Sequence, residues 1–123
     1  MNAEIRSHKD LTVWQKSIDL VEKIYTCTEQ FPQREMYGLA AQMRRAAVSI
    51  SSNIAEGRSR GTRKDFAHFL HMAFGSSSEL ETQLVIAKRL QIGKANEVES
   101  SEALLLEVSK MLRAMIDKLE ARS

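Results

Sequence analysis

The most constraining feature of the sequence is a long apolar repeat between residues 63 and 90. Its positions alternate in steps of four and three: Phe66, Leu70, Ala73, Ser77, Leu80, Leu84 and Ala87. Such steps place side chains on one face of an α-helix, and a repeat this long is typical of helices packed side by side at a shallow angle. The repeat therefore predicts one long helix over residues 63–90 with a buried seam.

Three further segments show the same periodicity and predict helices over residues 11–30, 37–56 and 96–120. Their expected core stripes are Leu11, Trp14, Ile18, Val21 and Tyr25; Leu39, Met43, Ala46 or Ala47, Ile50 and Ile54; and Val98, Ser101, Leu105, Val108, Leu112, Met115 and Leu119. One proline and five glycines in 123 residues provide too few turns for a sandwich or barrel. The sequence predicts a single all-α domain over residues 1–123, an antiparallel up-down-up-down four-helix bundle.

Local signals indicate where the predicted helices begin and end. Asp10 or Thr12 could cap the start of the first helix, and Pro32 follows its end. Gly57 is expected to cap the end of the second helix in a left-handed conformation. Thr62 is expected to cap the start of the third helix.

The residues offer little support for catalysis or metal binding. His68 and His71 lie three positions apart, but no third ligand completes a zinc site. Cys27 is the only cysteine and has no evident activating base, which also agrees with a reducing compartment. We expect a cytoplasmic protein that has no membrane span, is not an enzyme and needs no metal or cofactor.

The last two helices carry more apolar residues than one core face needs. Leu104, Leu105 and Leu106 are successive and cannot all face one seam, and three further apolar residues surround the repeat of the third helix: Phe69, Met72 and Phe74. These residues either broaden the core stripe or form an interface between copies of the chain. We favour self-association.

Positive charge is concentrated in the middle of the chain. Residues 34–64 hold seven Lys or Arg against two Asp or Glu, whereas the whole chain has a net charge of +2. The candidate nucleic-acid-binding residues are Arg44, Arg45, Arg58, Arg60, Arg63 and Lys64. For the last four, a solvated surface and a surface that binds RNA or DNA are equally consistent with the sequence.

Three polar positions on the second predicted helix favour structural roles: Arg44, Arg45 and Asn53. Arg45 lies beside small core residues and could form an internal ion pair with Glu56, Glu79 or Glu81. Asn53 falls on the inner stripe, where its amide needs a partner such as Ser77 or Glu79 on the next helix.

A series of motifs resembles one known family across almost the whole chain, from about Asp10 to Leu119. The motifs are Asp10-Leu11 with Val13-Trp14-Gln15-Lys16, Tyr37-Gly38-Leu39, Arg44-Arg45-Ala46-Ala47-Val48-Ser49-Ile50, Asn53-Ile54-Ala55-Glu56-Gly57, Phe66-x-x-Phe69-Leu70, and Gly75-Ser76 with Glu79-Leu80-Glu81-x-Gln83-Leu84. The chain resembles the bacterial four-helix-bundle family that includes proteins encoded in intervening sequences of large-subunit ribosomal RNA genes. One departure is Ser51, where the family usually has proline.

The resemblance implies a ring-like homopentamer and a kinship with the accessory protein of diversity-generating retroelements. That accessory protein works with a reverse transcriptase and structured RNA through a basic surface. The resemblance carries over no catalytic residue. We therefore expect a non-enzymatic RNA-binding accessory protein, and the alternative is a protein-interaction scaffold that does not bind nucleic acid.

Overall fold

The computed structural model describes residues 7–121, and within this range it contains helices and no strand. The elements are the short 3-10 helices η1 (His8–Asp10) and η2 (Gln33–Glu35) and the long helices α1 (Thr12–Glu29), α2 (Leu39–Arg60), α3 (Arg63–Arg89) and α4 (Ala95–Glu120). The expected all-helical class and the four long helices are confirmed. Only the end of α2 departs from its predicted bounds by more than two residues.

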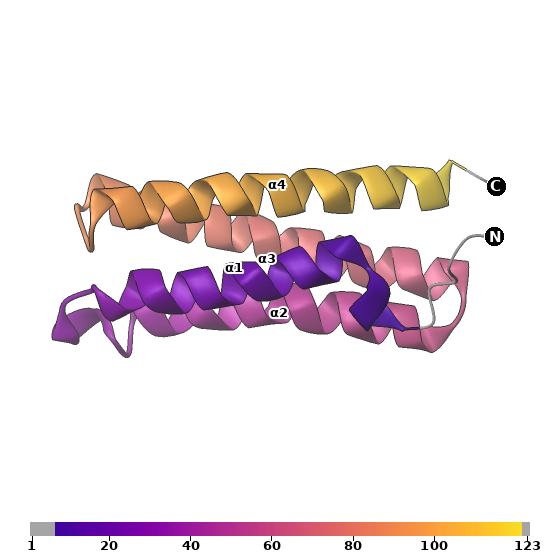
Figure 1. The fold of residues 1–123 in the computed structure, drawn as a ribbon, viewed down its shortest axis with the longest axis horizontal. Helices are drawn as coiled ribbons and strands as arrows, with labels where there is room; N and C mark the ends of the chain where they lie inside the picture. The colour runs from indigo at the N-terminus through magenta and orange to yellow at the C-terminus, as the bar shows by residue number, and fades with distance from the viewer. Residues whose placement is uncertain (1–6, 122–123) are drawn as a thin grey trace.

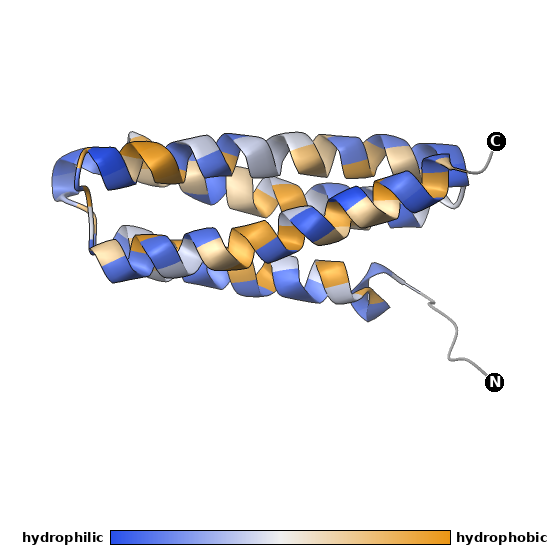
Figure 2. Cartoon of the chain, turned by 90° about the horizontal axis from the view of Figure 1, so that it is seen from above, coloured by the Kyte–Doolittle hydropathy of each residue, from blue (hydrophilic) through white to orange (hydrophobic). Residues whose placement is uncertain are grey.

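The four long helices lie side by side (Figure 1). α1 packs against α2 and α4, and α3 packs against the same two helices, so α1 and α3 occupy opposite corners of the bundle. Apolar and polar residues alternate along each helix in Figure 2, as expected where one face is buried and the other is solvated.

The core of the bundle follows the predicted seams of α3 and α4 closely. Leu70, Leu80 and Leu84 on α3 are fully buried, and so are Val108 and Leu112 on α4. At the two ends the seam shifts by one residue: Ala67 and Ile116 are buried in place of Phe66 and Met115, which are half-buried.

From Trp14 onward the predicted core stripe of α1 is wrong by one position, whereas Leu11, just before the helix, is buried as expected. Its buried residues are Val13, Ser17, Leu20, Ile24, Cys27 and Thr28. Trp14, Ile18 and Val21 are only half-buried, and Tyr25 is exposed. Both stripes have helical spacing, but the small Ser17 can face the interior because its hydroxyl finds partners there. It donates to the Trp14 carbonyl at 2.6 Å and contacts the Ser51 hydroxyl of α2 at 2.8 Å.

The predicted C-terminal cap of α2 is also wrong. Gly57 lies inside the helix and is buried, and the left-handed residue that ends α2 is Gly61, with φ of 86°. A Cβ on Gly57 would lie 2.7 Å from the Phe69 Cβ of α3. This glycine therefore allows a close approach between α2 and α3.

The N-terminal caps were predicted with mixed success. The Thr62 side chain accepts from the Asp65 N–H at 3.1 Å and caps α3 as expected. The residue that precedes α1 is Leu11, and no side chain caps this helix. The chain enters α1 directly from η1. The Ser7 hydroxyl caps the start of η1 by accepting from the Lys9 N–H at 3.2 Å.

Asn53 does not make the expected contact with α3. Its Nδ2 atom donates within α2, to the Ser49 carbonyl at 2.9 Å and the Ser49 hydroxyl at 3.1 Å, and does not contact Ser77 or Glu79. The contact to α3 is instead the 2.8 Å bond between the Ser49 and Ser76 hydroxyls. Serine side chains are short, so a hydrogen bond between two of them requires α2 and α3 to lie close together.

Candidate nucleic-acid interface

The six candidate basic residues fall into two groups on the structure. Arg44 and Arg45 lie on the second turn of α2, whereas Arg58 to Lys64 surround the turn between α2 and α3. At 1.5 Å per residue, Arg45 and Arg58 are about 20 Å apart along the helix. Residues that share one charged segment in the sequence therefore occupy two separate surfaces.

Arg44 is held against α1. Its Nε donates to the Thr28 hydroxyl at 2.8 Å, and its guanidinium carbon lies 4.5 Å from the centre of the Tyr25 ring. These contacts restrain the guanidinium and use one of its donors for packing between α1 and α2.

Arg45 lies on another face of α2, where its side chain is exposed beside a shallow hollow that Glu79 also lines. None of the expected ion pairs with Glu56, Glu79 or Glu81 forms among the described residues. Glu79 instead faces the Gln83 amide at 3.4 Å. Arg45 is therefore available to solvent.

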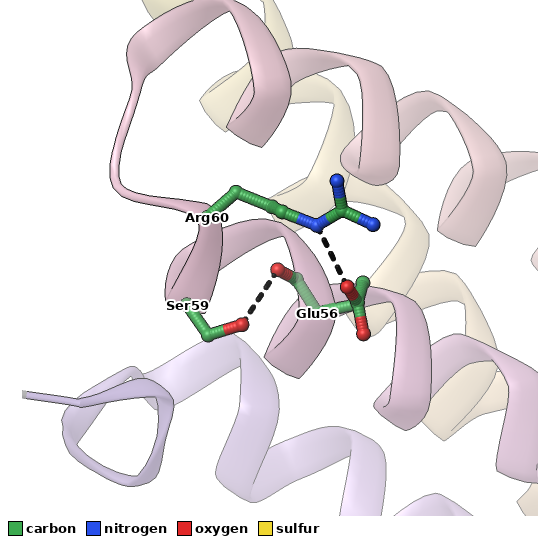
Figure 3. Close-up of polar contacts among 3 residues, drawn as sticks. All are labelled: Glu56, Ser59 and Arg60. Atoms are coloured by element: carbon green, nitrogen blue, oxygen red, sulfur yellow. Dashed lines mark hydrogen bonds and ion pairs between the residues drawn. The ribbon is translucent and has the colours of Figure 1, made fainter.

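Arg60 lies in the last turn of α2, where a positive charge complements the helix dipole. Figure 3 shows its Nε directed at Glu56 Oε2, at 2.7 Å, while the Ser59 hydroxyl donates to the Glu56 carbonyl at 2.9 Å. The guanidinium also lies 5.0 Å from the centre of the Phe69 ring on α3. Arg60 is exposed despite these contacts, and a surface ion pair of this kind contributes about 0.3–0.5 kcal/mol.

Arg63 and Lys64 open α3, where cations oppose the dipole of their own helix. The structure resolves this conflict for Arg63, whose Nη1 donates to the Leu119 carbonyl at the C-terminal end of α4, 3.3 Å away. Lys64 is exposed and makes no hydrogen bond or ion pair with the residues that the structure describes. Together with half-buried Arg58, these residues make one end of the bundle basic.

The two histidines considered as metal ligands have separate contacts. His71 Nε2 lies 2.7 Å from Glu120 Oε2 on α4, and the His68 ring meets the edge of the Phe69 ring with centroids 5.1 Å apart. No group of three or more potential metal ligands occurs within residues 7–121. In the same range, no helix combines the length and apolar character of a membrane span.

Apolar surface remains on two opposite faces of the bundle. Between α3 and α4 a hollow of about 640 Å³ is lined by Phe74, Leu105 and Leu106, among others, and Leu106 is 53% exposed. Between α1 and α2 a hollow of about 290 Å³ is lined by Trp14, Ile18, Val21 and Val48 together with small residues. Sequence reasoning assigned the α1 residues to the core and so missed the second face.

Comparisons with known proteins agree with this architecture. The profile of the 23S rRNA-intervening sequence protein family matches residues 9–114. The fold is similar to a crystal structure of a protein of unknown function from the S23 ribosomal protein family of Bacteroides thetaiotaomicron. The TM-score is 0.76 and the identity 24%, with 85% of this chain and 98% of that chain covered. No curated protein sequence matches. Because the family profile spans most of the chain, the protein belongs to the 23S rRNA-intervening sequence protein family.

Proposed function

We propose that this protein is a non-enzymatic RNA-binding accessory protein that acts as a ring-like homopentamer of antiparallel four-helix bundles. The observation that carries the proposal is the basic turn, defined as Arg58, Arg60, Arg63 and Lys64. All four residues lie at one end of the bundle, and three of them are exposed. Exposed cations that surround one turn can contact several phosphates of one strand.

The chemistry of the basic turn favours binding that depends little on base sequence. Arginine and lysine side chains contact phosphate oxygens, and these contacts position a nucleic acid without reading its bases. The Phe69 ring is half-buried and Arg60 covers one of its faces, so little of it is open to base stacking.

Assembly would strengthen such a surface. One bundle presents four cations at its basic turn, of which Arg60 is already shared with Glu56. Copies arranged in a ring would present this patch repeatedly to one folded RNA, so weak contacts would act together. The exposed apolar residues on both faces of the bundle support contacts between copies.

A charge-neutralising variant tests the RNA-binding proposal. Arg58, Arg60, Arg63 and Lys64 are changed together to Ala, and binding to a structured RNA is followed by fluorescence anisotropy at several salt concentrations. We expect weaker binding, and we expect the slope of log affinity against log salt to fall by up to about four, since each phosphate contact contributes about 0.9.

A matched control removes equal charge at the other end of the molecule. Arg34, Lys88, Arg89 and Lys94 are changed to Ala, and this variant should keep most of the affinity and the salt slope. Circular dichroism and light scattering establish that both variants keep helix content and mass. Equal RNA binding by the wild type and the basic-turn variant at low salt would refute the proposal.

Light scattering tests the assembly separately. A homopentamer of the 13.9 kDa chain has a mass of about 70 kDa. A single-copy mass at micromolar concentration would refute it. The Leu106→Glu variant places a charge on the apolar hollow between α3 and α4 and should lower the mass if that face joins copies.

The α3–α4 hollow also favours the second candidate function, a protein-interaction scaffold. Its apolar lining has the character of a groove that receives an amphipathic helix. Such a scaffold could bind a partner protein, for instance a reverse transcriptase. Co-purification of a stoichiometric protein that survives nuclease treatment and is lost in Leu106→Glu would favour this function. Loss in the basic-turn variant would favour RNA.

A further inference from the structure

A hollow of about 560 Å³ lies where the start of α3 meets the end of α4. It is lined by Arg63, Lys64, Ala67, His68, His71, Leu119 and Glu120. Four of these residues carry nitrogen donors, and only Glu120 carries a carboxylate. The hollow therefore differs from the rest of the basic turn, because its nitrogen donors line one concave surface between α3 and α4.

Most of the donors around this hollow are not consumed by contacts within the chain. Lys64 has no polar partner among the described residues, and His68 makes only its edge contact with Phe69. Arg63 donates one long bond, 3.3 Å, from Nη1 to a backbone carbonyl. The exception is His71, which lies 2.7 Å from Glu120.

The charge of the hollow suits a dianion. Among its lining residues, Arg63 and Lys64 against Glu120 give a net charge of +1. A group with two negative charges and several oxygens could accept bonds from the guanidinium, ammonium and imidazole N–H donors together. A phosphate monoester has these properties, whereas an internal phosphodiester of RNA carries a single charge.

From this arrangement we propose that the hollow binds a phosphate monoester dianion, presented by the phosphorylated end of an RNA strand or by a free phosphate compound. The RNA source rests on the proposed function. The hollow adjoins the basic turn, because Arg63 and Lys64 belong to both. A strand whose end occupies the hollow can therefore continue across the basic turn.

The charged groups nearest the hollow are Arg63, Lys64 and Asp65 on α3, Glu120 on α4, and Arg60 on α2 beyond Phe69. The three cations outnumber the two carboxylates, so these surroundings favour an anion. Each positively charged side chain that contacts the dianion should tighten binding by roughly fivefold, the effect of one exposed charge contact.

The test is a proton NMR titration of the full chain with sulfate, a dianion, at constant pH. We expect the His68 and His71 ring resonances to shift as sulfate binds. His8 is the internal control, because it packs on Trp14 on another part of the surface. The double variant with His68→Gln and His71→Gln should bind sulfate more weakly in calorimetry, and so should Lys64→Gln.

Three versions of one oligoribonucleotide identify the source of the phosphate: 5′-phosphorylated, 3′-phosphorylated, and without a terminal phosphate. Tighter binding of a phosphorylated form, lost in the double histidine variant, supports the RNA end. Sulfate binding without this preference supports a free phosphate compound. The proposal is overturned if sulfate leaves both resonances unmoved and no terminal phosphate improves binding. In that case, retained RNA binding that still depends on Arg58 would leave the proposed function standing.

Discussion

Gly57 and Gly75 provide a paired test of the packing between α2 and α3. Both lie inside long helices, so replacement by Ala carries the same intrinsic gain of about 1 kcal/mol in helix propensity. Their surroundings differ. A Cβ on Gly57 would lie 2.7 Å from Phe69 Cβ and 3.3 Å from the Phe66 carbonyl oxygen, whereas a Cβ on Gly75 would have no neighbour within 4 Å.

The opposite surroundings predict opposite signs. Carbon atoms in favourable contact are about 3.5–4 Å apart, so Gly57→Ala must push the two helices apart or distort them. Overpacking of this kind costs about 1–3 kcal/mol, which outweighs the propensity gain. We expect Gly57→Ala to lower the free energy of unfolding by about 1 kcal/mol and Gly75→Ala to raise it by about 0.5–1 kcal/mol.

Urea unfolding monitored by circular dichroism measures both changes. The protein concentration is held constant, because self-association would make stability depend on it. Light scattering on each variant separates a change within the bundle from a change in assembly, since Gly75 is exposed. The reasoning is refuted if Gly57→Ala is at least as stable as the wild type, or if Gly75→Ala is destabilised while its mass is unchanged.

Three further changes test individual contacts. Ser51→Ala removes the buried bond to Ser17 and should cost about 0.5–1.5 kcal/mol in urea unfolding; no loss would show that the bond is dispensable. Arg44→Ala removes the bond to Thr28 and should cost about 1 kcal/mol without altering RNA affinity, whereas a parallel loss of affinity would place Arg44 in the interface. Burial raises the pKa of Cys27 and outweighs a lowering contact with a neighbouring hydroxyl, so the native state favours the neutral thiol. Stability should therefore hold below about pH 8.5, the ordinary thiol value, and fall as the pH rises above it; a Cys27→Ala variant with the same pH profile would contradict this.

The helices could be predicted from the sequence because their signals are local. The repeat of α3 contains seven positions in unbroken register, and six of them are buried as expected. The α1 stripe was misassigned because two neighbouring stripes are both largely apolar. A periodicity cannot choose between them, and the large Trp14 favoured the wrong one. The buried stripe includes Ser17, whose hydroxyl contacts Ser51 of another helix, and a pattern within α1 carries no information about that contact.

The candidate site was predictable only as a list of residues. The excess of arginine and lysine between residues 34 and 64 indicated an anionic partner, but it could not show that Arg44 packs on Tyr25 while Lys64 stays free of described partners. Glu120 was outside that segment and carried no motif. The structure places it 2.7 Å from His71, 49 positions away.

By itself, the sequence determined the helical class, the lengths of the helices and the buried seams of α3 and α4, because hydrophobic spacing along one helix is read within that helix. Tertiary structure decided which stripe of α1 is buried, that Gly57 is a point of close approach, and that the start of α3 shares a hollow with the end of α4. These outcomes depend on distances between segments far apart in the chain. Such distances are set by the packing of all four helices together.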